Sequence, residues 1–194
     1  LRGEAFYEPS DVGRRPLNAA LGRMNSLLRR PLDPTARRQV FYSFHYANDA
    51  FRAQQIRNMG VIEGNSPCAP NEWEAVRRQG DAAIQRWIDN TMQYRSCVIV
   101  LVGSQTAQRP WIDYEIRKAW NDKRGLFGIY VHNLNCPRQG FCYQGQNPFA
   151  NVVLNNGQPL SNYVSCHDPG PDAYNVIRRM MGTWIETAIR TKRP

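Results

Sequence analysis

The sequence predicts an α/β fold in which a mostly parallel sheet lies between layers of helices. The main observation is residues 96–120, where an apolar, β-branched run at 97–102 is followed by a short polar loop and a helical pattern. Two further apolar runs, 40–44 and 126–131, also alternate with segments of helical spacing. Strands that alternate with helices are typical of parallel β-α-β units, which gives the fold class.

The helices are predicted from apolar residues three and four positions apart and from signals at their ends. Asn48 or Asp49 is the expected cap of the first helix, and Asp81 is the expected cap of a second part after a break at Gly80. Pro110 is the expected first residue of the helix after the central strand, since proline is favoured there. The predicted helices are residues 50–58, 71–92, 110–120 and 173–190.

We expect the flavodoxin-like strand order 2-1-3-4-5, which makes a three-layer sandwich with the sheet in the middle. The second strand would be a short one within residues 59–67, and residues 133–172 would be a long irregular insertion with a short strand at 162–166. In this order the strands at 40–44 and 97–102 are neighbours. The Ser43–Asp49 loop then lies beside the Gly103–Glu115 segment, at the sheet edge where such folds bind ligands.

Composition divides the chain and limits its partners. Residues 1–38 hold eight arginines against four acidic residues and are predicted to be a basic, partly helical arm, while residues 39–194 form the main domain. The arm either covers the core or docks a partner or an anion. The net charge of +9 favours polyanions, but most of it is spread singly, so we do not expect nucleic acid as the partner.

The cysteines and the hydropathy point to a reducing cytoplasm without a membrane or a metal. The five cysteines include no CxxC pair, so we expect no metal site, and Cys97 is expected to be a small apolar residue of a buried strand. No apolar run is long enough to span a membrane.

Two separated motifs resemble TIR (Toll/interleukin receptor) domains. These are the strand and loop FYSFHY at 41–46 and the helix start WIDYEI at 111–116. More closely, the chain is similar to the TIR-like branch of the bacterial Thoeris anti-phage system. That branch is matched by RNMGVIEGN at 57–65, WIDN at 87–90, WND at 120–122 and GIYVHNL at 128–134, and the resemblance covers roughly residues 39–190.

The resemblance implies an NAD glycohydrolase or ADP-ribosyl cyclase that cuts the nicotinamide–ribose bond of NAD. NAD is then the substrate, and no cofactor is expected. The product would be an ADP-ribose-derived, cyclised signal that activates a separate effector protein, and such domains can self-assemble on activation. The alternative is a non-catalytic TIR-like module that signals by assembly. A third reading is a nucleic-acid binder that uses the arm.

The resemblance also assigns the site residues. Glu115 corresponds to the catalytic glutamate that binds the nicotinamide-side ribose, and Trp111 corresponds to the aromatic position before it. The remaining expected substrate-binding residues are Ser43, Phe44, His45, Tyr46 and Asn48. The basic pair that often follows this strand in TIR domains is absent here, where His45–Tyr46 stand instead.

Each of these residues also has a plain structural interpretation. Glu115 could be a surface residue that pairs with Lys118, three positions along the helix. Trp111 could only pack the helix start on the core, and Ser43 and His45 could only bind backbone. Asn48 could be a helix cap instead of a ligand. A single carboxylate would suffice for NAD, because nicotinamide leaves as a neutral ring and needs no general acid, unlike an ordinary sugar leaving group.

Overall fold

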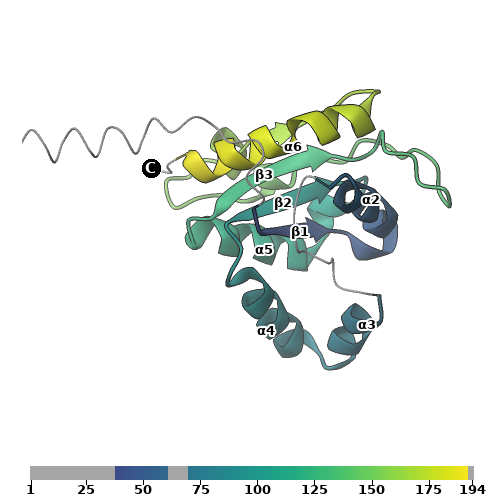
Figure 1. The fold of residues 1–194 in the computed structure, drawn as a ribbon. Coiled ribbons are helices and arrows are strands. Elements are labelled where there is room, and N and C mark those ends of the chain that lie inside the picture. Colours follow the sequence, from purple (N-terminus) through teal and green to yellow (C-terminus); the bar gives the residue numbers. More distant parts are fainter. Residues whose placement is uncertain (1–37, 61–69, 192–194) are drawn as a thin grey trace, which may run out of the picture. The chain divides into compact units, whose positions relative to one another are not determined.

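The computed structural model describes residues 38–60 and 70–191, and within them a parallel sheet lies between helical layers (Figure 1). The sheet order is β1-β2-β3-β4, with every neighbouring pair parallel. The strands are β1 (Val40–Phe44), β2 (Cys97–Val102), β3 (Gly125–Tyr130) and β4 (Cys166–His167). The helices are α2 (Tyr46–Asn58), α3 (Pro70–Arg78), α4 (Asp81–Met92), α5 (Pro110–Asn121) and α6 (Ala173–Arg190). This confirms the predicted α/β fold.

The central strand β2 is buried along its whole length and divides the interior into two cores. Its six residues are fully buried, and they alternate between the two faces of the sheet, as the two-residue period of a strand requires. Cys97, Ile99 and Leu101 pack on one side, and the three valines at 98, 100 and 102 pack on the other.

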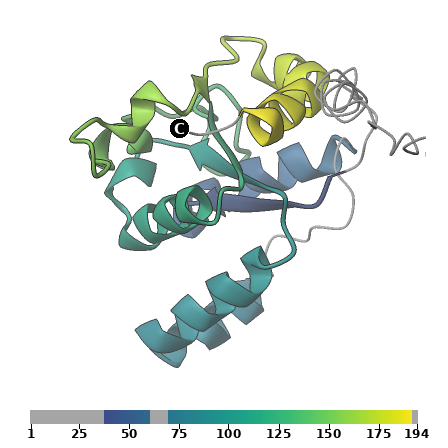
Figure 2. The ribbon, with the colours of Figure 1, turned by 90° about the vertical axis from the view of Figure 1, so that its left-hand side faces the viewer.

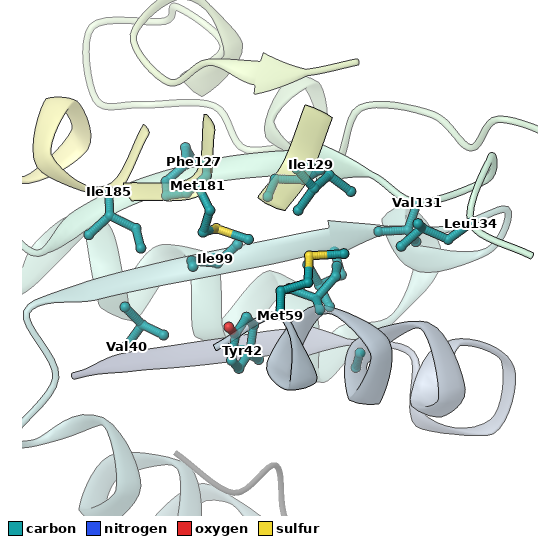
Figure 3. Packing of buried hydrophobic residues seen from close by; sticks show 14 of the residues in the cluster. Val40, Tyr42, Met59, Ile99, Phe127, Ile129, Val131, Leu134, Met181 and Ile185 are labelled. Carbon is teal, nitrogen blue, oxygen red and sulfur yellow. The ribbon is translucent and has the colours of Figure 1, made fainter. Parts of the chain in front are cut away.

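The first core lies between the sheet and helices α2 and α6. A view turned by 90° about the vertical axis shows α6 and α2 on one face of the strands and α5 on the opposite face (Figure 2). A close view shows side chains from strands and helices interlocking there (Figure 3). The labelled members are Val40, Tyr42, Met59, Ile99, Phe127, Ile129, Val131, Leu134, Met181 and Ile185.

The second core lies between the sheet, helices α4 and α5 and the long insertion. Helix α5 contributes Ile112, Ile116 and Ala119, the positions predicted to face inwards from their spacing. The insertion contributes four buried apolar residues, so it forms a wall of the core despite its irregular course. These residues are Phe149, Val152, Leu160 and Val164.

Most predicted elements are confirmed. The helical stretch divides at Gly80, whose φ of 87° is a left-handed value that favours glycine. Helix α5 begins at Pro110, and α6 has the predicted bounds. The predicted arm at 1–38, except Arg38, and the core of the predicted second strand at 59–67 lie outside the described residues. In the part of the chain that is described, no helix has the length and apolar character to cross a membrane.

Three local predictions were wrong. Helix α2 begins at Tyr46, so Asn48 and Asp49 lie inside its first turn and the cap position is His45, whose side chain makes no capping bond. Gly80, not Asp81, occupies the cap position of α4. The short strand is β4 at 166–167, because residues 160–162 form a 3-10 turn that buries Leu160 in the second core.

Candidate active site

A pocket of about 310 Å³ opens beside β1 and the start of α5. This volume lies at the lower end of the range for small-molecule sites. The walls are mainly aromatic and aliphatic, with a few charged groups among them. The lining residues are Val40, Phe41, Tyr42, Phe44, His45, Tyr46, Ala47, Glu74, Arg77, Trp87, Thr91, Arg95, Arg109, Pro110, Trp111, Ile112 and Glu115.

Glu115 lies in the wall of this pocket and contacts strand β1 through Ser43. It is one turn into α5, on the same buried face as Ile112 and Ile116, and only 7% of it is exposed. Strand alternation points Ser43 towards α5, and its hydroxyl donates a hydrogen bond of 2.5 Å to Oε2 of Glu115. The two residues are 72 positions apart, and the pairing of β1 with β2 brings them together, as predicted.

Burial controls the charge of Glu115. It raises the pKa of this carboxyl from 4.5 to about 8, although the bond from Ser43 acts in the opposite direction. At neutral pH the Glu115 carboxyl is therefore mostly protonated. The alternative of a surface residue paired with Lys118 is excluded, because Nζ of Lys118 lies 3.5 Å from Asp89 and 3.3 Å from Asp122 instead.

His45 joins the pocket wall at the end of β1. It caps α2 with its backbone, and in the described structure its buried Nδ1 has no hydrogen-bond partner. Burial lowers the pKa of His45, and the positive charge of Arg109 lowers it further. The imidazole is therefore neutral at physiological pH.

Aromatic rings supply much of the remaining wall. Phe44 and Tyr46 pack with their ring centroids 6.0 Å apart, next to the end of β1. Trp111 meets Tyr114 edge to face at 6.0 Å and lines the pocket as well. Trp111 therefore packs against its own helix and also lines the pocket.

The structure groups most of the predicted site residues. Phe44, His45, Tyr46, Trp111 and Glu115 line the pocket, and Ser43 contacts Glu115 from the strand behind it. Asn48 is not among the lining residues. It lies in the first turn of α2, where its backbone carbonyl accepts a hydrogen bond of 3.2 Å from Arg52.

Sequence reasoning missed two arginines. Arg52 is 1% exposed and pairs with the equally buried Asp49 at 3.0 Å, while also donating to the carbonyls of Leu134 and Gly140. Arg109 lies at the cap of α5 and lines the pocket. The three-residue spacing of Asp49 and Arg52 was the only signal for the first. No feature of the sequence indicated that Arg109 would line the pocket.

Within residues 38–60 and 70–191, no three histidine, cysteine or acidic side chains come together as a possible metal site. Burial raises the pKa of the Cys166 thiol to about 12, so that thiol is protonated and inert near neutral pH.

Comparison with known proteins finds two similarities. Residues 41–136 match the sequence profile of the family described as the TIR-like domain of Thoeris protein ThsB. A relative from Bacillus cereus (strain MSX-D12), named ThsB1 and described as a candidate cyclic ADP-D-ribose synthase, is 32% identical over 117 residues. The match covers 58% of this chain and 61% of the relative. Residues 41–136 therefore resemble the TIR-like domain of the Thoeris protein ThsB, and the chain spans less than two thirds of the length of the relative that it matches.

Proposed function

We propose that this protein cleaves NAD between nicotinamide and ribose and converts the rest of the molecule into a cyclic ADP-ribose-type product. The observation that carries the proposal is the position of Glu115, buried in the wall of an aromatic pocket and hydrogen-bonded to Ser43. The name of the Bacillus cereus relative, a candidate cyclic ADP-D-ribose synthase, supports the same reaction class.

One carboxylate is enough for this bond. The nicotinamide of NAD is a cationic pyridinium, so it leaves as a neutral ring and takes the bonding electron pair with it. The ribose that remains has an oxocarbenium-like transition state with positive charge. A carboxylate beside it, in a site with little water, stabilises that charge and accepts hydrogen bonds from the ribose hydroxyls.

The raised pKa of Glu115 fits this role once substrate is bound. In the empty pocket the carboxyl is largely protonated at neutral pH, because burial raises its pKa to about 8. A bound pyridinium brings a positive charge into the same pocket, which favours the carboxylate and lowers its pKa. Substrate binding therefore drives the release of the Glu115 proton and produces the charge that the transition state needs.

The aromatic walls suit the second half of the reaction. Cyclisation requires that a group of the same ADP-ribose, not water, attacks the ribose cation. Phe44, Tyr46 and Trp111 give flat apolar surfaces on which nicotinamide can stack and from which water is excluded. In the cell, we propose that the released nucleotide activates a separate effector protein.

The test is NAD turnover by the purified full chain. We expect nicotinamide release and an ADP-ribose-derived product, resolved by chromatography and mass, and loss of both in Glu115→Gln. Asp113→Asn is the matched control, because Asp113 is an acidic residue of the same helix that pairs with Arg117 at 2.7 Å on the surface. A Glu115→Gln protein that turns over NAD like the Asp113→Asn protein would refute the role of Glu115.

A folded wild-type protein without turnover at high concentration would favour the non-catalytic module. One feature supports that second candidate, namely a loop at 136–145 that exposes Phe141 by 66% and Tyr143 by 89%. Exposed aromatic side chains are common at protein interfaces.

A further inference from the structure

The pocket is lined by arginines that have no role in the proposed cleavage at Glu115. Three arginines line it, Arg77, Arg95 and Arg109, against the two carboxyls of Glu74 and Glu115. Glu115 is mostly neutral at pH 7, because burial raises its pKa to about 8. A surplus of arginine charge favours a ligand with negatively charged oxygens.

Two buried nitrogens in this wall have no partner within the described ranges. They are Nε of Arg109 and Nδ1 of His45. Gln105 accepts a hydrogen bond of 2.7 Å from Nη2 of Arg109 and so fixes the guanidinium plane. A buried polar atom without a hydrogen-bond partner is destabilising, and a bound ligand with acceptor oxygens would supply the partner that these two nitrogens need.

The two residues also interact with each other. The charge of Arg109 lowers the pKa of His45, together with the effect of burial, so the two groups share one electrostatic environment. They come from different segments, since His45 follows β1 and Arg109 precedes α5. Both line the same pocket as Glu115.

We propose that Arg109 and His45 form the subsite for the diphosphate of the dinucleotide, with Arg109 as the main anchor. This inference rests on the proposed function, because it assumes that the ligand is a nucleotide with a diphosphate. A guanidinium binds anionic oxygens through two parallel N–H bonds, which fix orientation as well as position. Arg109 would thereby position the ribose at Glu115.

Binding of an anion here has a measurable effect on His45. Negative oxygens beside the imidazole favour its protonated form and raise its pKa, opposite to the effect of Arg109. Neutral nicotinamide has no such effect. The charged groups that line the pocket with His45 are Glu74, Arg77, Arg95, Arg109 and Glu115.

The experiment measures binding to the full chain by calorimetry, with inorganic pyrophosphate, ADP-ribose and nicotinamide as probes. We expect Arg109→Gln to weaken pyrophosphate and ADP-ribose by about 10- to 100-fold, the effect of one charged hydrogen bond, and to leave nicotinamide unchanged. Arg117→Gln is the matched control on the exposed face of α5, where Arg117 pairs with Asp113. Equal ADP-ribose affinity in Arg109→Gln and wild type would overturn the proposal.

A second measurement is independent of the variant's folding. The pKa of His45 is followed by NMR in the wild-type protein, and it should rise with pyrophosphate but not with nicotinamide. An unchanged His45 pKa at saturating pyrophosphate, or no pyrophosphate binding at all, refutes the subsite. If pyrophosphate binding depends on Arg109 but the wild-type protein does not turn over NAD, the anion subsite is supported and the proposed function is refuted. NAD turnover that is equal in Arg109→Gln and in wild type supports the proposed function and refutes the subsite.

Discussion

Replacing Glu115 by glutamine should stabilise the protein, and more so as the pH rises. The folded state raises the pKa of Glu115 from 4.5 to about 8, so it binds the proton more tightly than the unfolded chain does. The contribution of Glu115 to the free energy of unfolding is therefore fully present below pH 4.5 and is lost as the pH rises through about 8. Glutamine is neutral throughout and can still accept the bond from Ser43, so it avoids this loss.

The size of the effect follows from the same shift. A difference of roughly 3.5 pKa units, at 1.36 kcal/mol per unit, gives an upper limit of about 5 kcal/mol above pH 9. Between pH 5 and pH 8, we expect the stability of Glu115→Gln relative to wild type to increase by about 3.5 kcal/mol.

Urea unfolding at pH 5, 6, 7 and 8 measures this difference directly. Asp113→Asn serves as the control, because it changes an exposed carboxylate of the same helix and should stay within about 0.5 kcal/mol of wild type. A Glu115→Gln advantage that is the same at all four pH values would refute the argument that Glu115 is buried in its neutral form.

Three other substitutions test the contacts around the site. Ser43→Ala removes the hydrogen bond that lowers the pKa of Glu115, so the rise of kcat/KM with pH should move to higher pH; an unchanged midpoint would contradict this. Arg52→Met should cost about 3–5 kcal/mol in urea unfolding, and a double variant that adds Asp49→Asn should cost less than the single one. Gly103→Ala would place a β-carbon 2.6 Å from Cγ of Asp49 and should lower the free energy of unfolding by about 1–3 kcal/mol. A change within about 0.5 kcal/mol would show that the Asp49 carboxyl moves aside freely.

The arrangement of the site could be predicted where it depends on strands and helices. Six consecutive apolar residues indicated that β2 is central, and Pro110 marked the start of α5. With β1 and β2 as neighbours, the topology alone brought Ser43 to Glu115. These signals are local and strong, because burial of a whole strand requires an apolar residue at every position.

The errors arose where distant parts of the chain decide local structure. Asp49 looks like a helix cap, but its carboxyl is used by Arg52, which in turn binds carbonyls 82 and 88 positions away at Leu134 and Gly140. Strand β4 has only two residues, and its pairing with β3 defines it more than its own sequence does. Neither the carbonyls that bind Arg52 nor the pairing of β4 with β3 could be predicted from residues close by in the sequence.

The division of the interior by β2 also determines how substitutions combine. Side chains on one face of this strand contact α6, and those on the other face belong to the same core as Ile112 of α5. Changes at Ile99 and Val100 alter separate sets of contacts, so their energetic effects should be additive although the residues are adjacent in sequence. Changes at Val98 and Val100 share one set and should be coupled. The α6 side can therefore be redesigned for stability independently of the wall that holds Glu115.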